Sequence, residues 1–140
     1  MTATNTSIST EYRDGILIAV PLAAMAAVLM GTFAVVGEDG YAVASEDVGA
    51  IGQTCIGIWD NDAENPNAAG TVNGIAHRGK QFLVANSAVD PVTQADFGAP
   101  VYIEDNQTIA KTDGAGSRSL AGRFMGFDTQ YTGSVWVEIV

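Results

Sequence analysis

The amino-acid sequence predicts a small all-β fold, and length, composition and turn spacing lead to that prediction. The 140 residues are enough for about one ordinary domain. Hydrophobic residues make up 47% of the chain, charged residues only 16%, and there are 16 glycines. Many short apolar segments alternate with turn-forming clusters, which is typical of a barrel or sandwich. We therefore expect a mainly β protein: a small antiparallel barrel or sandwich with one or two short helical turns and a flexible N-terminal arm.

The first expected element is a polar arm. Met1 to Thr10 (MTATNTSIST) holds mostly small, uncharged side chains. Such a segment cannot bury enough apolar area to order itself. We therefore expect residues 1–11 to form a flexible arm and residues 12–140 to form a single β-rich domain.

A long apolar run follows the arm. From Gly15 to Gly37 there are 23 residues without a charge, and a helix of that length can cross a hydrocarbon layer of about 30 Å. Pro21 interrupts the run, and its flanks are acidic apart from Arg13, so the excess of cations that orients a membrane helix is missing. A signal peptide fits no better, because its first segment would be net acidic and its apolar core too long. The triplet at 42–44 (Ala-Val-Ala) does imitate a cleavage site, so export or anchoring stays an alternative.

The interpretation that we favour divides this run into three pieces. Ile16 to Val20 is short and β-branched, as a buried strand would be. Ala23 to Met30 contains good helix formers, or forms an irregular turn. Gly31 to Val36 reads as a second strand, closed by the Gly37-Glu38-Asp39-Gly40 turn.

The rest of the chain is punctuated at short intervals. Eight more segments are predicted as strands: Tyr41–Ala44, Thr54–Trp59, Thr71–His77, Gln81–Ala85, Val101–Ile103, Thr108–Lys111, Arg123–Phe127 and Ser134–Val140. One short helix is predicted from Pro91 to Phe97, where Asp90 would cap the first amide groups.

Two parts of the chain echo each other. GTFAVVGEDGYAVA begins at Gly31, and GAPVYIEDNQTIAK, of the same length, begins at Gly98. Each is followed by an apolar piece with a central glycine, Cys55–Ile58 and Phe124–Phe127. Either an old duplication or two meanders with the same turn chemistry explains this pattern.

Charge and rare residues exclude several functions. Six Lys and Arg against 16 Asp and Glu give a formal charge of -10, so the basic face that nucleic-acid binding needs is absent from the composition. The single cysteine, Cys55, excludes an internal disulfide framework and a thiolate zinc cluster. The single histidine, His77, excludes most multi-histidine metal sites. The high apolar content also excludes a disordered acidic tail.

Two segments are candidate binding sites. His77-Arg78-Gly79-Lys80 is the only concentrated positive patch: either an anion site or contact for an acidic partner, or a hairpin turn with exposed cations, which we favour. Asp60 to Asn65 resembles the start of a calcium loop, but Asn65 and Thr71 stand where such a loop needs Gly and Glu. We expect a solvated loop there.

The remaining candidates predict structure rather than chemistry. Cys55 lies in an apolar strand and is expected to be inert. The aromatic residues Trp59, Trp136, Phe33, Phe124 and Phe127 are expected to fill the core or an interface. The acid pairs Glu38-Asp39, Glu46-Asp47 and Glu104-Asp105 fall at predicted turns, where solvated carboxylates cost little. Gly114-Ala115-Gly116 follows no strand-to-helix pattern, so a phosphate cradle is not expected. We therefore expect no catalytic, cofactor-binding or metal-binding residues, no cofactor and no enzymatic activity.

The order of these segments resembles the capsid decoration, or cement, proteins of tailed bacteriophages. The resemblance spans roughly Val20 to Val140. It rests on GTFAVVGEDGYAVA (31–44), RGKQFLVANS (78–87), DFGAPVYIEDNQTIAKT (96–112), AGRFMGFD (121–128) and GSVWVEI (133–139). The alanine-rich Ala23–Met30 segment departs from the family pattern.

The resemblance implies a structural protein that binds the outer surface of a phage capsid in many copies and cements it. The implied partners are the major capsid protein lattice and, in a homotrimer, the chain itself, with no nucleic acid or membrane. The implied location is the virion, after assembly in the host cytoplasm. The arm, Met1 to Glu11, would order against the capsid, and Tyr131, Val135 and Trp136 would supply an apolar contact patch. The alternative is an exported β-rich binding module that recognises a carbohydrate or a cell-surface partner.

Overall fold

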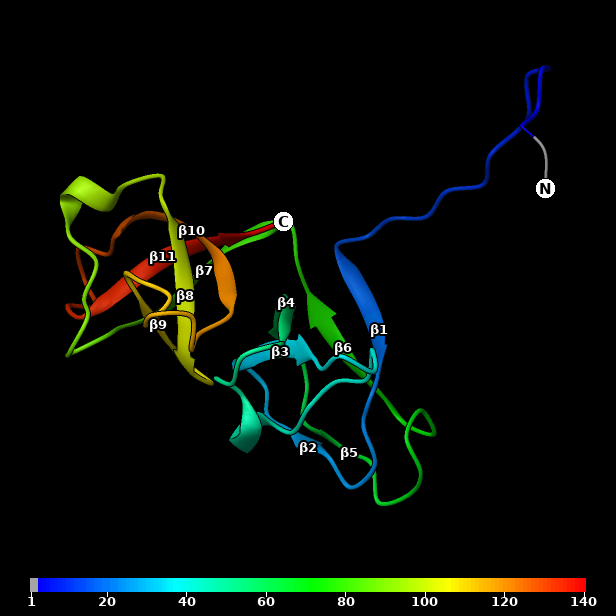
Figure 1. Cartoon of the computed structure of the whole chain (residues 1–140), viewed down its shortest axis with the longest axis horizontal. Helices are drawn as coiled ribbons and strands as arrows, with labels where there is room; N and C mark the ends of the chain where they lie inside the picture. The colour runs from blue at the N-terminus through cyan, green and yellow to red at the C-terminus, as the bar shows by residue number, and fades with distance from the viewer. Residues whose placement is uncertain (1–2) are drawn as a thin grey trace.

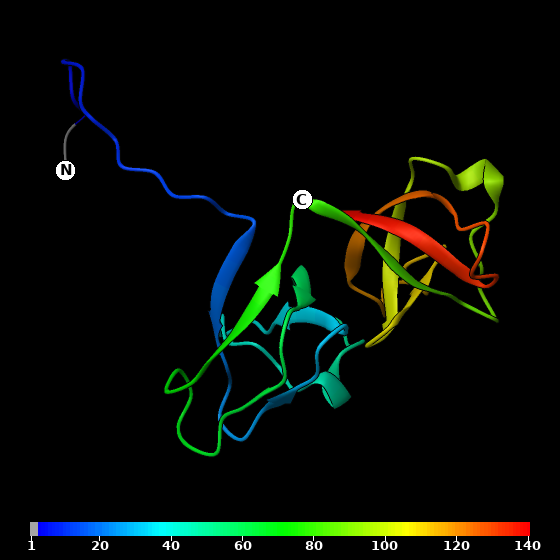
Figure 2. The same ribbon diagram turned by 180° about the vertical axis from the view of Figure 1, so that it is seen from behind.

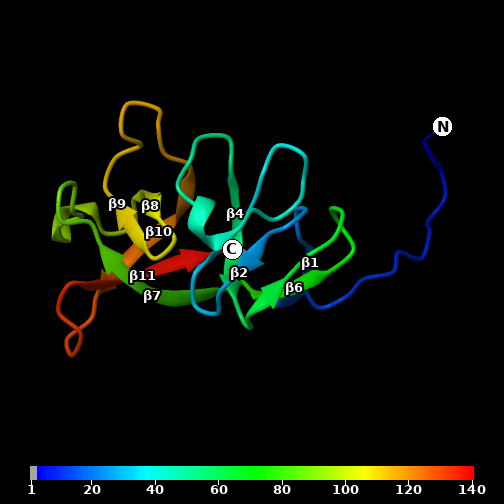
Figure 3. The same cartoon turned by 90° about the horizontal axis from the view of Figure 1, so that it is seen from below.

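The computed structural model describes residues 3–140 and is mainly β, with 41% of residues in strands and 4% in two 3-10 turns. Two bodies of strands lie next to each other, an N-terminal sheet and a C-terminal barrel (Figure 1). Figures 2 and 3 show the same arrangement from behind and from below. Over residues 3–140, no helix is long and apolar enough to span a membrane. The all-β prediction is confirmed.

The N-terminal sheet has four antiparallel strands in the order β1-β6-β4-β3. These are β1 (Leu17–Pro21), β3 (Phe33–Val36), β4 (Thr54–Trp59) and β6 (Asn73–His77). A separate two-stranded sheet joins β2 (Ala27–Val28) to β5 (Ala63–Glu64). The first 3-10 turn, η1 (Ser45–Asp47), precedes β4.

The C-terminal barrel closes in the order β10-β11-β7-β9-β8. Its strands are β7 (Lys80–Asn86), β8 (Pro100–Asp105), β9 (Thr108–Ala110), β10 (Leu120–Phe127) and β11 (Ser134–Ile139), and the second 3-10 turn, η2 (Gln94–Asp96), lies between β7 and β8. The sequence analysis predicts an antiparallel barrel. One pair of the observed barrel, β7 with β9, is parallel.

The strand β3 joins the two bodies because its side chains alternate between two hydrophobic clusters. Phe33 and Val35 belong to the cluster that fills the barrel, together with Phe124, while Ala34 belongs to a second cluster built around Trp59. All these side chains are buried. Successive side chains of a strand point to opposite faces, so β3 is buried on both faces, and the hydrophobic cluster of the barrel continues onto one face of the sheet.

Hydrogen bonds reinforce this junction. The Phe33 amide donates to the Asn106 carbonyl at 3.0 Å, and Asn106 Nδ2 donates to the Ser45 carbonyl at 3.1 Å. The Gln53 amide donates to Ser119 Oγ at 3.2 Å, and that hydroxyl donates to the Ala50 carbonyl at 3.0 Å. Polar groups at the seam thus find partners across it, which avoids the free-energy cost of burying them unpaired.

Gly74 allows the second cluster to close. A Cβ on this β6 glycine would lie 2.5 Å from the Trp59 ring, far inside van der Waals contact. The Trp59 ring therefore packs directly on the Gly74 backbone, and that ring is 1% exposed.

Most predicted strands are confirmed, and β4 has the predicted bounds. The strand predicted at Tyr41–Ala44 is wrong: only isolated bridges form there, from Ala42 to Leu22 and to Val36. Ala23–Met30 is a turn followed by β2 rather than a helix. The helix predicted at Pro91–Phe97 shortens to η2, which Thr93 and Asp96 cap instead of Asp90.

The segment before β1 extends away from both bodies (Figures 1 and 2). Residues 3–16 form no strand or helix, and all are exposed. The remainder of the predicted arm, residues 1–2, lies outside the described residues.

The shared core predicts that sheet and barrel unfold in one transition. In a Trp136→Phe variant Trp59 reports on the sheet, and in a Trp59→Phe variant Trp136 reports on the barrel. Within each variant, we expect tryptophan fluorescence and far-UV circular dichroism to give the same urea midpoint. Adding Phe33→Ala lowers both midpoints, at a cost of about 3–5 kcal/mol in the free energy of unfolding.

The matched control is Phe97→Ala, because Phe97 is 54% exposed on the barrel. This substitution should cost less than about 1.5 kcal/mol. If Phe33→Ala shifts the unfolding transition reported by Trp59 but leaves the transition reported by Trp136 in place, a shared core is contradicted.

Candidate functional site

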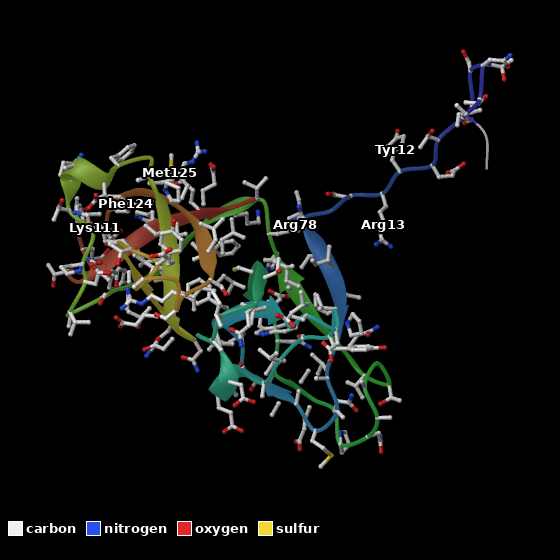
Figure 4. The ribbon with its side chains drawn as sticks, in the orientation of Figure 1. Tyr12, Arg13, Arg78, Lys111, Phe124 and Met125 are labelled. Atoms are coloured by element: carbon white, nitrogen blue, oxygen red, sulfur yellow. The ribbon has the colours of Figure 1, made fainter. Side chains whose placement is uncertain are left out.

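The positive patch lies where the chain passes from sheet to barrel (Figure 4). The predicted hairpin is wrong, because β6 pairs with β1 and β4 whereas β7 pairs with β11 and β9. The Arg78 amide donates to the Ile16 carbonyl, and the Gly79 amide donates to the Ile139 carbonyl. Residues 78 and 79 therefore connect the two bodies, and their backbone amides fix the crossing.

His77 is held by a carboxylate at this crossing. Its Nδ1 lies 2.8 Å from Asp60 Oδ1, and both side chains are partly exposed. An imidazole and a carboxylate at this distance orient each other, and a hydrolytic triad would need a third, nucleophilic group.

Cys55, the one thiol of the chain, does not supply that nucleophile. Burial raises its pKa to about 12, and its Sγ points to the Gly57 carbonyl at 3.8 Å. A thiol with this pKa stays protonated at neutral pH and is a poor nucleophile. It lines a groove of about 510 Å³ at the seam of sheet and barrel, together with Leu120, Arg123 and Ile139.

The loop at 60–65 is solvated, as predicted, at Asp60, Asn61, Asp62 and Glu64, which are exposed, and hydrogen bonds also tie it to neighbouring segments. Asn61 Oδ1 accepts from the Ile75 amide at 3.1 Å, and Asp62 Oδ1 accepts from the Met30 amide at 2.8 Å. Each of these oxygens serves a different neighbour. Across residues 3–140, no group of three or more His, Cys, Asp or Glu side chains is placed to hold a metal ion.

Asn65 is the buried centre of this loop. It is 0% exposed, and its Nδ2 donates to the carbonyls of Leu22, Ala23 and Ala68 at 3.0–3.2 Å. Its Oδ1 accepts from the Thr71 hydroxyl at 2.8 Å and from a backbone amide. An asparagine provides both donors and acceptors, so it satisfies backbone groups on both sides. The residue that disagrees with a calcium loop is therefore structural.

The aromatic residues divide between core and surface. Phe33, Phe124 and Trp59 are buried, and Trp59 Nε1 has no hydrogen-bond partner within the described chain. Phe127 is 43% exposed and packs edge-on against Phe124, as does Phe97 from another direction.

One of the three residues of the predicted C-terminal contact patch is not on the surface. Tyr131 is exposed, and Trp136 is half-buried on the outer face of the barrel, opposite Leu83 in the register of β11 and β7. Val135 is 0% exposed inside the barrel. Neighbouring strand positions point to opposite faces, so Val135 and Trp136 cannot serve the same surface, and Val135 cannot contact a partner.

The acid pairs are used in different ways. Asp39 Oδ1 and Asp105 Oδ1 each accept from a backbone amide two residues later, which stabilises their turns. Glu46 and Asp47 are exposed in η1. Glu104 instead joins a network that the sequence analysis missed.

That network fastens two loops at one end of the barrel. Arg118 Nη1 lies 2.8 Å from Asp90 Oδ2, and its Nη2 lies 3.7 Å from Glu104 Oε1. The Thr112 hydroxyl donates to the same Asp90 oxygen at 2.6 Å, and the Ser87 hydroxyl donates to Glu104 at 2.6 Å. Asp90 Oδ2 and Glu104 Oε1 each contact two side chains of this chain, so the network has a structural role.

Charge is distributed unevenly along the chain. Residues 14–77, which form the N-terminal sheet, contain eight Asp and Glu and no Lys or Arg. Residues 78–140, which form the barrel, contain seven Asp and Glu and five Lys and Arg. The net negative charge of the protein is therefore concentrated on the sheet.

In comparisons with known proteins, no family model, curated protein or solved structure matches the chain. Its function is therefore inferred from the fold and from the contacts described above.

The network at Asp90 predicts a pH dependence. The Thr112 hydroxyl lowers the pKa of Asp90 below its ordinary 3.8; desolvation opposes this, and the Thr112 amide and Arg118 add to it. A lowered pKa in the folded state stabilises the protein above the unfolded pKa, and this is lost as pH falls through the folded value. Asp90→Asn should therefore lower the melting temperature at pH 7, and the difference from wild type should shrink below a pH of about 4.

Asp113→Asn is the matched control. It removes the same charge from the loop that carries Arg118. The Asp113 carbonyl accepts from the Arg118 amide, but the Asp113 side chain makes no hydrogen bond or ion pair described within residues 3–140. Melting curves that show an equal, pH-independent effect of both substitutions would contradict the assignment.

Proposed function

We propose that this chain is a structural virion protein that binds the outer surface of a phage capsid in many copies and cements the shell. The observation that carries the proposal is the exposed segment before β1. A compact β body with an extended arm is the arrangement that the resemblance to decoration proteins implies.

The exposed segment before β1, which is the predicted arm together with residues 12–16, carries apolar side chains that no other part of residues 3–140 covers. Tyr12 is 96% exposed and Ile8 is 70% exposed. At the end of this segment the Ile16 carbonyl accepts from the Arg78 amide; its other described hydrogen bonds are local, such as the Thr4 hydroxyl to the Thr6 carbonyl and the Ile16 amide to Asp14. A segment with so few internal contacts orders by binding a partner, and a shell surface supplies one.

The charge of the protein favours an outer position. Because the chain has a net charge of -10, packaged DNA repels it. The same charge improves the solubility of the protein at high copy number. Assembly in the reducing host cytoplasm suits a chain whose single thiol is partly buried and protonated at neutral pH.

Cementing needs only modest contacts, repeated by symmetry. Binding at several points makes the later contacts intramolecular, which raises the total affinity through effective concentration. A homotrimer on the lattice multiplies the arms in this way. Tyr131 is exposed just before β11, the strand that carries the half-buried Trp136, and is available for contacts between copies of the chain.

Sedimentation of lysate from the native source through a detergent-free density gradient tests the proposal. We expect near-stoichiometric recovery of this chain with a major shell protein in one fast band, quantified by mass spectrometry. Combining Ile8→Ala with Tyr12→Ala should lower the recovery by about tenfold, since two apolar contacts are lost.

Val89→Ala is the control, because Val89 is 82% exposed on a barrel loop; its recovery should equal that of wild type. Recovery only in soluble or membrane fractions would contradict the proposal and favour an exported binding module instead.

A further inference from the structure

The alanine-rich segment that departs from the family pattern forms an exposed apolar ridge. Met25 is 73% exposed, Leu29 52% and Met30 66%. We call these three residues, with the exposed Ala27 between them, the methionine ridge. It belongs to β2 and its flanks, which Figure 1 places at the opposite end of the sheet from the arm.

Local backbone structure holds the ridge outward. Ala26 and Val28 are buried in the second cluster, so alternation along the extended segment turns residues 25, 27 and 29 to the solvent. Met25 has φ 61°, a left-handed conformation that is unfavourable for a residue with a Cβ. Such strain clusters at functional sites, and here it accompanies a side chain left in water.

Acidic residues border the ridge. Glu64 lies opposite Ala27 in the register of β5 and β2, and the Met30 amide binds Asp62. Ala27, Leu29, Asp62 and Glu64 line a groove of about 300 Å³. Because residues 14–77 hold no Lys or Arg, no cation of this sheet neutralises the border.

We propose that the methionine ridge binds a segment of a partner protein in which Lys or Arg residues flank apolar side chains. Methionine side chains are flexible and polarisable, which suits a surface that adapts to another chain. The acidic border attracts the cations and steers the segment into place. If the chain cements a phage shell, as proposed above, this partner is a segment of the shell subunit.

Charge argues against other occupants. The acidic border repels anionic lipid and nucleic acid. A second copy offers a barrel that is itself net acidic, and two of its cations, Lys111 and Arg118, already pair with their own carboxylates. A foreign cationic segment is the complementary partner. With the arm at the other end of the sheet, one copy would then contact the shell at two separated points.

Methyl NMR of the full chain, with its methionine methyl groups labelled with carbon-13, tests the ridge directly. The probe is a short peptide of alternating lysine and leucine. We expect the Met25 and Met30 methyl signals to shift while that of Met125, on the barrel (Figure 4), stays in place. Raising the salt concentration should weaken binding. A peptide of alternating glutamate and leucine, with the same apolar content, should leave all these signals unchanged.

Two variants separate the apolar and charged contributions. Met25→Asn with Leu29→Gln keeps a residue that tolerates the left-handed conformation and should weaken the peptide about tenfold, followed at Met30. Glu64→Gln should weaken it less and reduce its salt dependence. Val89→Gln, which removes an exposed apolar side chain from the barrel, should have no effect. Equal shifts with both peptides, shifts at Met125 of the same size, or no shifts would overturn the proposal.

Adding the same variants to shells that lack this chain distinguishes this inference from the proposed function. Shell binding that the ridge variants leave unchanged would overturn the ridge as the contact while cementing stands. Absence of shell binding, with the methyl shifts intact, would overturn cementing while leaving the ridge as a site for cationic apolar segments.

Discussion

The burial of β3 on both faces is the constraint on which the rest of the structure depends. Phe33 and Val35 enter the barrel cluster while Ala34 enters the cluster around Trp59. A small sheet needs a covered apolar face for stability. Sharing the barrel core covers one face of β3, and it fixes the N-terminal sheet and its ridge relative to the barrel.

The sequence predicted the fold class and most strands because their signals are local. Thr54–Trp59 is bounded by turn residues, and its apolar side chains reach both clusters, so its bounds match those observed. The same local chemistry misled at 78–80, where a glycine turn suits a hairpin and a crossing between sheets equally well. Only strand pairing, which joins residues far apart in the chain, separates the two.

The missed features share that long-range character. Asn65 serves carbonyls 42 and 43 positions earlier, and Arg118 meets Asp90 from 28 positions away. Val135 was grouped with Tyr131 and Trp136 near the C-terminus as one apolar patch, whereas strand alternation turns it inward. In the sequence, the methionine ridge was noticed only as an alanine-rich segment that departs from the family pattern. Its exposure follows from the pairing of β2 with β5, and a strand of two residues is too short for hydrophobic periodicity to reveal that pairing.

The proposed cementing role would give these pieces a common purpose. The sheet and the barrel share one hydrophobic cluster, and the two proposed contact surfaces, the arm and the methionine ridge, both lie on the N-terminal half. The most direct measurement heats purified particles with and without this chain and follows genome release with a DNA-binding dye. If many modest contacts raise the barrier to shell rupture, particles that carry the chain release DNA at a higher temperature, and adding purified chain to bare particles restores the difference. The same release temperature for bare and fully occupied particles would contradict a cementing role.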